Sequence, residues 1–415
     1  MNPFRASRAV QVMAATVAVL GLTMASACSS DDDSGGGDSG ASSVAAPEGS
    51  FPGKVATGEP VKIGLINNEG GQAISMPENR ESAQAVVEYA NENLGGIGGR
   101  PIELVICKQG EDPNQARDCA NQMVEAGVSA VLMTSSGNGN SMVPIITGAG
   151  IPYVSAAGQA SSELTTPNAF MWTGGLPGAL GSMAKYSAEQ GMKKVTAYTI
   201  DVPAATAGLQ AIGTPAFKAA GVELNVVAIP PGTPDSTPQV SAGLEGNPDG
   251  VIVIGESNLC TSVFKALSTV STTAKKMTIQ PCAAPAVVDA VGDSSLDGTK
   301  VFTASVINSD DPETLLYKAI MEKYAPDTET EGFAIVGYQG MLGLVRATES
   351  VQGTDTSPAA LTAAIKSAKD VVLPAGYGLT FTCDGTAAPG MPSVCGTGGL
   401  ILTFDNGELV DPQLI

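Results

Sequence analysis

From Val61 onward, short apolar runs alternate with longer stretches in which apolar residues recur every three or four positions. The run VKIGLIN at residues 61–67 predicts a strand, and the periodic stretch at 78–96 predicts a helix that ends at two glycines. The same alternation predicts strands at 102–107, 129–136 and 151–158, and helices at 113–127 and 140–150. Unbroken apolar strands that alternate with helices are typical of a parallel sheet covered on both faces.

A second series of the same kind begins after residue 178. It predicts helices at 179–193, 204–221 and 258–270, and strands at 195–201, 222–230, 250–256, 276–281 and 299–305. Three more helices are predicted at 311–326, 331–351 and 357–368, and a hairpin-like segment at 378–410. Two αβ series in one chain predict two lobes, and ligands of open α/β sheets bind beyond the carboxyl ends of the strands.

The first 58 residues carry a different pattern. A basic start, an apolar run at about 9–22 and the small residues Ala25-Ser26-Ala27 precede Cys28, as in a secretory signal. The run is shorter than the ~20 residues of a spanning helix. Cys28 with its flanks resembles the lipobox of bacterial lipoproteins, so we expect acylation there; the alternative is an incidental cysteine. Residues 29–58 contain few apolar side chains that a core could bury, which predicts a flexible tether. The spacing of its aspartates at 31–33 matches no EF-hand calcium loop.

Composition narrows the chemistry. The net charge of −20 leaves no basic surface for nucleic acid, and the chain contains no histidine. Histidine is the commonest general base and zinc ligand, and no glycine-serine nucleophile elbow is present, so we expect no enzyme, no cofactor and no metal site. A Ser-Lys or two-carboxylate enzyme stays open as an alternative.

Six of the seven cysteines lie beyond the tether, an even number in a chain predicted to be exported. This indicates disulfides. A metal site is disfavoured, because the chain has neither the CxxC spacing nor the histidine that such sites commonly use. Several pairings are formally possible. The local one is favoured because each couple brackets one turn or one strand–helix–strand unit: Cys107–Cys119, Cys260–Cys282 and Cys383–Cys395.

The order of several segments resembles the type I periplasmic-binding-protein family, of the leucine/isoleucine/valine-binding kind that feeds ABC importers. The segments are VKIGLI, YANENLGGIGGRPIELVI, DPNQARDCANQMVEAGVSAVL, SSGNGNSMVPIITGAGIPYVSAAGQASSELT and GFAIVGYQGMLGLVRA, and the likeness covers about 61–410. It implies a two-lobed α/β clamshell. Each lobe is expected to be a parallel-sheet three-layer sandwich, with three hinge crossings near Pro177, Ser305 and Thr382.

The expected organisation follows from this likeness. Residues 1–27 are the lipoprotein signal peptide and 28–58 the acylated cysteine and tether; lobe one takes 59–177 and 305–381, and lobe two takes 178–304 and 382–415. The likeness implies a monomeric receptor, anchored to the outer face of the cell membrane as in actinobacterial relatives. It would capture a small organic ligand for an ABC permease. The alternative is a ligand sensor that uses the same clamshell without transport.

Two loops of lobe one are candidate ligand contacts. The first ends a predicted strand and begins a helix, where backbone N–H groups and side chains suit a carboxylate: Ser135, Ser136, Gly137 and Asn138. In the family the corresponding serine and loop contact the ligand carboxylate; helix capping is the alternative. The second loop aligns with another contact loop, or is a plain turn before a short helix: Ala157, Gly158, Gln159 and Ala160.

Lobe two departs from the amino-acid-binding pattern. Ala204 and Ala205 stand where relatives have an aromatic clamp, and Cys282 aligns near the glutamate that meets the ligand ammonium. A buried ammonium without a partner is costly, so an amino-acid ligand needs a substitute acid, for which Asp201 and Glu256 are the candidates. Either is equally a solvated strand end or a hydrogen-bond acceptor near the hinge.

We therefore expect a ligand with an acid or amide group and an apolar body, and branched-chain amino acid binding is the alternative. A family aspartate at the lobe crossing aligns near Pro177, which carries no charge. Trp172, near the first crossing, either stacks on the ligand or packs at the hinge.

Overall fold

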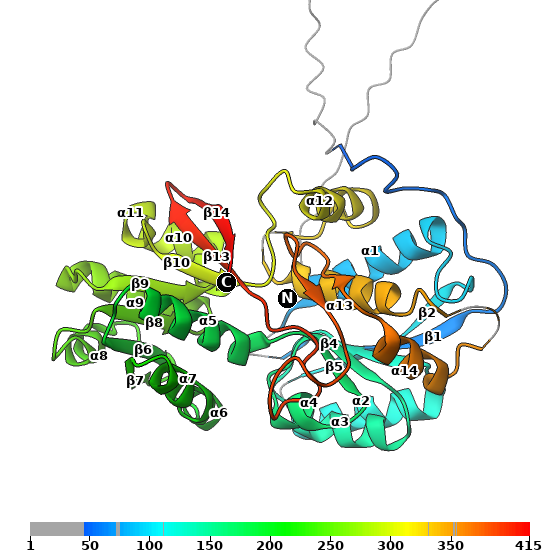
Figure 1. The fold of residues 1–415 in the computed structure, drawn as a ribbon, viewed down its shortest axis with the longest axis horizontal. Coiled ribbons are helices and arrows are strands. Elements are labelled where there is room, and N and C mark those ends of the chain that lie inside the picture. The colour runs from blue at the N-terminus through cyan, green and yellow to red at the C-terminus, as the bar shows by residue number, and fades with distance from the viewer. Residues whose placement is uncertain (1–44, 72–74, 111, 331, 352, 354) are drawn as a thin grey trace, which may run out of the picture. The chain divides into compact units, whose positions relative to one another are not determined.

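The computed structural model describes residues 45–71, 75–110, 112–330, 332–351, 353 and 355–415. Cys28 and the other residues of the predicted leader lie outside the described residues, as do Asp31 to Asp33. Within the described residues, no helix is both long and apolar enough to cross a membrane. The described chain is built around two separate sheets, called lobe one and lobe two below (Figure 1).

Lobe one is a five-stranded sheet in the order β2-β1-β3-β4-β5, and every pairing in it is parallel. Its elements are β1 (Val61–Asn68), α1 (Pro77–Asn93), β2 (Ile102–Gln109), α2 (Pro113–Ala126), β3 (Ala130–Met133), α3 (Gly139–Gly148), β4 (Tyr153–Ala157), α4 (Ser161–Thr165), β5 (Ala169–Thr173), α12 (Pro312–Tyr324), α13 (Ala334–Ala347) and α14 (Pro358–Ser367), with the small ribbon β11 (Val371–Val372) and β12 (Thr380–Phe381).

Lobe two is a seven-stranded sheet in the order β14-β13-β10-β9-β8-β6-β7. Its elements are α5 (Gly175–Glu189), β6 (Lys194–Ile200), α6 (Pro203–Gly208), α7 (Thr214–Ala219), β7 (Glu223–Ile229), α8 (Thr237–Gly243), β8 (Gly250–Ile254), α9 (Ser257–Val270), β9 (Lys275–Ile279), α10 (Pro285–Val291), α11 (Asp293–Leu296), β10 (Lys300–Thr303), β13 (Leu400–Asp405) and β14 (Glu408–Leu414). The hairpin β13–β14 joins antiparallel to β10, so this sheet is mixed at one edge.

Local signals in the sequence set several helix ends. In α2, the Asp112 side chain accepts a hydrogen bond from the Asn114 N–H, Pro113 occupies the first turn, and Gly127 ends the helix in the left-handed conformation. Two features differ from the predictions. Residues 169–173 form a fifth strand that the pattern did not predict. The predicted hairpin at 378–410 is divided, because β12 pairs with β11 and the true hairpin is formed by β13 and β14.

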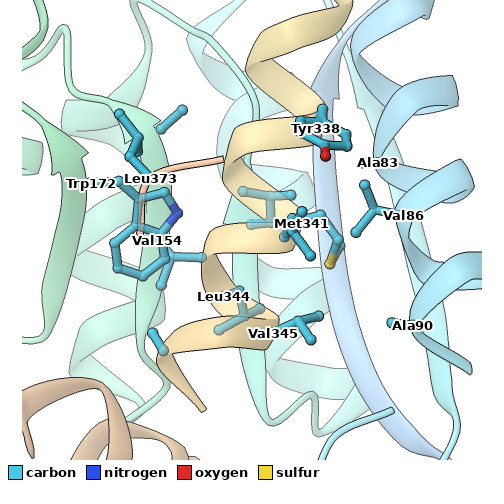
Figure 2. Packing of buried hydrophobic residues seen from close by; sticks show 14 of the residues in the cluster. Ala83, Val86, Ala90, Val154, Trp172, Tyr338, Met341, Leu344, Val345 and Leu373 are labelled. Carbon is cyan, nitrogen blue, oxygen red and sulfur yellow. The ribbon is translucent and has the colours of Figure 1, made fainter. Parts of the chain in front are cut away.

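Helices cover both faces of the sheet in lobe one, with α2, α3 and α4 on one face and α1, α12 and α13 on the other (Figure 1). In Figure 2, α13 lies beside α1, with Met341 near Val86; α1 packs on β1 and β2, and α13 packs on β3 and β4. The two helices approach so closely that a side chain at Gly337 would overlap the carbonyl oxygen of Asn79, so glycine is required there.

Trp172 belongs to this core. It is 1% exposed, its Nε1–H donates to the Gly340 carbonyl oxygen at 3.1 Å, and its ring stacks on Phe381 with centroids 4.7 Å apart. Figure 2 shows the indole on the sheet side of α13, beside Val154 and Leu373. The packing interpretation of this residue is therefore confirmed.

Three passages carry the chain from one sheet to the other. The first lies at Gly174, between β5 and α5, and the second at 304–311, between β10 and α12. Gln339 of α13 fixes the second, since its Nε2 donates to the carbonyl oxygens of residues 304 and 374. For the third, residues 393–395 still hydrogen-bond to β5, so the passage into lobe two occurs at 396–399, later than the crossing expected near Thr382.

Candidate functional site

The strand order of lobe one reverses between β1 and β3, and the carboxyl ends of these strands are where an open α/β sheet binds ligands. A hydrogen bond joins the two strands at this point: the Thr134 hydroxyl donates to Asn67 Oδ1 at 2.6 Å. Both side chains are buried. The segments that follow β1 and β3 are therefore held together by polar side chains as well as by apolar packing.

Ser136 is the centre of a buried polar group behind α3. Its hydroxyl accepts hydrogen bonds from Gln109 Nε2 at 2.6 Å and from the Asn138 backbone N–H at 2.9 Å, and the side chain is 4% exposed. The Asn138 amide also donates to Gln109 Oε1, at 3.4 Å. A serine hydroxyl that accepts two bonds still has its own proton to donate. The bond from the Asn138 N–H to Ser136 forms a turn before α3, and Asn138, the cap residue of α3, makes no side-chain capping bond. The Ser136 proton is the group that a ligand oxygen could accept.

The two predicted contact loops are brought together by one hydrogen bond. Gln159 Nε2 donates to the Ser135 hydroxyl oxygen at 2.6 Å, and Gln159 itself is exposed. Gly137 is exposed between these contacts, one residue before Asn138, which directly precedes α3. Gly158 is buried, and a side chain there would overlap Leu164 and Met171. The residues selected from the sequence therefore lie at one edge of one sheet.

Glu163 fixes the second loop from within. It is 1% exposed; one carboxylate oxygen accepts from the backbone N–H groups of Gln159 and Ala160, both at 2.8 Å, and the other accepts from the Tyr153 hydroxyl at 2.6 Å. Burial raises the pKa of Glu163 above its usual range, against the lowering effect of these hydrogen bonds. Two backbone N–H groups of the second predicted contact loop, at 159 and 160, are therefore already bound.

A charged group lies at the end of β1. Glu69 forms ion pairs with Arg80 of α1 (Nε to Oε2, 2.8 Å) and Lys108 of β2 (Nζ to Oε1, 2.7 Å). The hydrogen bond from Arg80 lowers the pKa of Glu69 to about 2, and the hydrogen bonds from Lys108 and Asn67 act in the same direction. Glu69 is consequently a permanent anion that is already paired.

The carboxyl ends of the strands in lobe two carry fewer polar contacts. Asp201 follows β6, is exposed, and its carboxylate has no hydrogen-bond or ion-pair partner among the described residues. Glu256 follows β8 and caps α9, accepting from the N–H groups of Asn258 at 2.7 Å and Leu259 at 3.1 Å. Ala205 lies with Ala204 in α6, and the Ala205 N–H donates to the Val202 carbonyl oxygen. Of the two candidate acids, only Asp201 is uncommitted.

The three disulfides join the cysteines in the favoured local pairs, 107–119, 260–282 and 383–395. The first ties β2 to α2 in lobe one. The second ties α9 to the turn after β9 in lobe two, and the third closes the loop beside β5. No group of histidine, cysteine, aspartate and glutamate side chains suited to a metal ion occurs in the described part of the chain.

Sequence reasoning missed three residues of this edge: Gln109, Glu163 and Glu69. Glu163 had a local signal, because a glutamate at the third position of a short helix commonly binds the backbone N–H groups before it. Gln109 ends β2 and meets Ser136 only because β2 and β3 both flank β1 and end at the same edge of the sheet. Glu69 had no signal beyond its place directly after an apolar run.

The comparisons agree with this geometry. Residues 60–394 match the family model described as periplasmic binding protein. A search of curated protein sequences gives no match. Among solved structures, an ABC transporter substrate-binding protein from Sphaerobacter thermophilus is 20% identical, with 86% of this chain and 98% of that chain covered and a TM-score of 0.71.

The names of two other similar proteins of known structure refer to different ligands. The branched-chain amino acid transporter substrate binding protein LivJ from Streptococcus pneumoniae, in complex with isoleucine, is 18% identical over 86% of this chain and 99% of that chain, with a TM-score of 0.67. A fatty acid ABC transporter substrate-binding protein from Thermomonospora curvata is 17% identical over 88% of this chain and 93% of that chain, also with a TM-score of 0.67. At such identities the likeness shows the two-lobed α/β fold and no ligand.

Proposed function

The chain belongs to the periplasmic binding protein family, and we propose that it is a lipid-anchored receptor which delivers a small organic ligand to an ABC importer. Family membership makes it an extracytoplasmic solute-binding protein and not an enzyme. The anchor at Cys28, the monomeric state and the importer of the branched-chain or hydrophobic amino-acid type are parts of the proposal.

The ligand we propose has an acid or amide group and an apolar body. The observation that carries this is the pair of adjacent hydroxyls in lobe one. Ser135 and Ser136 each accept at least one hydrogen bond from a glutamine side chain and keep a proton to donate. A carboxylate or amide oxygen is the complementary acceptor, and charge-assisted hydrogen bonds of this kind are the stronger ones.

The lobe-two residues favour an apolar body over an α-ammonium. Ala205 takes little space, Cys282 is bound in a disulfide, and Glu256 already caps a helix. Asp201 is the one uncommitted acid of the two candidates. A branched-chain amino acid is the second candidate ligand, and it requires Asp201 to receive the ammonium.

A thermal-shift screen of the purified, oxidised protein tests the ligand class. The panel contains branched and aromatic amino acids, the matching deaminated acids and amides, and fatty acids. A ligand present at 100 times its dissociation constant stabilises the folded state by about 2.7 kcal/mol, which raises the melting temperature measurably. We expect acids or amides to do so and leucine not to.

An Asp201→Asn variant separates the two ligand classes. If leucine raises the midpoint of the parent protein and Asp201→Asn abolishes that effect, the chain binds amino acids and the proposed class is wrong. Asp235→Asn is the matched control, since Asp235 lies in lobe two but precedes α8 on a different loop.

Measurements of ligand uptake in cells distinguish a transport receptor from a sensor. Deleting the gene abolishes uptake of the radiolabelled ligand if the chain serves an importer. If uptake is unchanged while a transcriptional response to the ligand is lost, the chain is a sensor.

A further inference from the structure

Two consecutive asparagines end β1, and their side chains are hydrogen-bonded differently. Asn67 Nδ2 donates to the Met76 carbonyl oxygen at 2.9 Å, and Asn67 Oδ1 accepts from the Thr134 hydroxyl at 2.6 Å. Asn68 is 6% exposed, and its Oδ1 is buried with no hydrogen-bond partner among the described residues. Buried polar groups are rarely left unpaired, so this oxygen at the edge of the proposed ligand site points to a missing donor.

The missing donor identifies one kind of ligand. We infer that Asn68 is a further ligand-binding residue of lobe one, and that it selects a carboxamide over a carboxylate. A carboxamide carries N–H donors beside its oxygen, whereas a carboxylate only accepts hydrogen bonds. This inference rests on the proposed function, because it narrows the proposed class of acid or amide ligands to the amides.

The side chain of Asn68 lies on the face of the sheet that carries the Ser136 group. Residues two apart on a strand share a face, and Ile66 packs in the apolar cluster with α2 and α3. Asn68 is aligned with Gln109 of β2, which reaches Ser136 beyond β3. Since β1 lies between β2 and β3 and neighbouring strands are about 4.8 Å apart, the Asn68 amide and the Ser136 hydroxyl are within reach of one ligand group.

The polar neighbours of Asn68 are committed to other partners. Gln109 Nε2 donates to the Ser136 hydroxyl at 2.6 Å, and the Asn138 side-chain amide donates to Gln109 Oε1 at 3.4 Å. The Gly110 N–H, which follows Gln109, donates to Gln115 Oε1 at 2.9 Å. A bound group with an N–H would therefore supply what the described residues do not.

A primary carboxamide matches both protein groups at once. Its oxygen accepts from the Ser136 hydroxyl, and its NH₂ group donates to Asn68 Oδ1. A carboxylate pairs with the hydroxyl but leaves the Asn68 oxygen unpaired in a buried place. An analogue that leaves a buried polar group of the site unpaired is rejected strongly, which makes Asn68 a residue that determines specificity.

The charges at this edge also favour a neutral ligand group. Arg80 and Lys108 both pair with Glu69, the residue that directly follows Asn68. A carboxylate bound beside Asn68 would lose its hydration without gaining either cation, and burial of an unpaired charge is costly. The net charge of the chain, −20, acts in the same direction.

Isothermal titration calorimetry of the purified, oxidised protein with matched amides and acids tests this. The pairs are 4-methylpentanamide and 4-methylpentanoate, hexanamide and hexanoate, and phenylacetamide and phenylacetate. We expect the amide of a pair to bind about tenfold more tightly than its acid, since only the acid leaves a buried acceptor unpaired. Asn68→Leu removes that acceptor, so it should weaken amide binding about tenfold and leave acid binding nearly unchanged.

Asn93→Leu is the matched control. Asn93 is also a buried asparagine of lobe one, but it ends α1, and its Nδ2 donates to the Tyr324 hydroxyl at 2.9 Å. This variant should lower the melting temperature and keep the parent's ratio of amide to acid affinity. Asn68→Leu should keep the parent's melting temperature, because Asn68 Oδ1 has no hydrogen bond to lose. Asn68→Asp, which retains an acceptor oxygen, is a second variant and should still bind the amide.

The outcomes separate this inference from the proposed function. An acid that binds as tightly as its amide, or a ratio that Asn68→Leu leaves unchanged, would overturn the inference while the proposed ligand class stands. If no member of any pair binds, the proposed ligand class fails and the inference fails with it.

Discussion

The two sheets share a strand order but differ at the edge where ligands bind. In lobe one the order is β2-β1-β3-β4-β5, and in lobe two the parallel strands follow as β7-β6-β8-β9-β10, so each places its first strand second in the sheet. At the carboxyl ends of lobe one, the buried side chains of Gln109, Ser136 and Glu163 are all hydrogen-bonded, and the exposed Gln159 bonds to Ser135. At the same ends of lobe two, the carboxylate of Asp201 is exposed without a partner among the described residues.

This difference separates what the fold supplies from what the loops supply. The topology gives each sheet a place where the strand order reverses, and it does so whatever residues follow the strands. The side chains of lobe one are held by neighbours in fixed positions, which suits recognition of one kind of polar group. Lobe two offers small side chains and one uncommitted carboxylate, which leaves room for the rest of the ligand to vary.

The largest expected effect concerns two of the three disulfides, Cys107–Cys119 in lobe one and Cys260–Cys282 in lobe two. Replacing both cysteines of Cys107–Cys119 or of Cys260–Cys282 by alanine should lower the free energy of unfolding by about 3 kcal/mol in the loop-entropy account. The 22-residue separation in lobe two should make its loss slightly larger than that of the 12-residue one. Urea denaturation of the two double variants measures this, and an unchanged midpoint in either would contradict it.

The second prediction compares two carboxylates that bind backbone N–H groups. Glu163→Ala leaves two N–H groups and the Tyr153 hydroxyl without their acceptor in a buried place, so the free energy of unfolding should fall by about 2 kcal/mol or more. Glu256→Ala removes an exposed helix cap in lobe two and should cost about 1 kcal/mol. Urea denaturation measures both losses of unfolding free energy. Equal losses would mean that the burial of Glu163 adds nothing to the cost of removing its carboxylate.

The third prediction concerns ligand affinity. Ser136→Ala should weaken binding of an acid found in the thermal-shift screen by about tenfold, because a hydrogen bond to a charged group is lost. Ser161→Ala is the control, since that serine is exposed at the start of α4 and bonds to Asn140. Isothermal titration calorimetry measures both, and an equal loss in the two variants would remove Ser136 from the site.

The smallest effect is the pH dependence of Glu69. Its pKa of about 2 in the folded state lies below the ordinary carboxylate value, so the ionised form stabilises the fold above that ordinary value. This stabilisation is lost as the pH falls from about 4.5 to about 2. Glu69→Gln should therefore cost less than about 1 kcal/mol at pH 7 and nothing near pH 2.

Unfolding of Glu69→Gln and of the parent protein, followed at pH 7 and pH 3, tests this sign. Glu81→Gln is the matched control, because Glu81 also contacts Arg80 but is more exposed. A difference between Glu69→Gln and the parent that grows toward acid pH would contradict the assignment.

Much of the fold was predictable because its signals are local. The helix at α2 begins at Asp112-Pro113 and ends at Gly127 as predicted, and of the possible cysteine pairings the favoured local one is formed. β5 was missed because its run AFMWT precedes two glycines and resembles a loop. The loops of Ser135, Ser136 and Gln159 were chosen from the sequence, whereas the hydrogen bond between Ser135 and Gln159 was not predictable from it.

The sequence by itself determined most of the elements, their alternation, the even number of cysteines beyond residue 58 and the absence of histidine, because these depend on neighbouring residues or on composition. Only the tertiary structure decided which polar side chains meet. Gln109 reaches Ser136 because β2 and β3 both flank β1 and end at one edge. The Trp172 Nε1–H reaches the Gly340 carbonyl oxygen, 168 residues away in sequence, because α13 packs against the sheet of lobe one. Contacts of this range arise from packing, which no local pattern encodes.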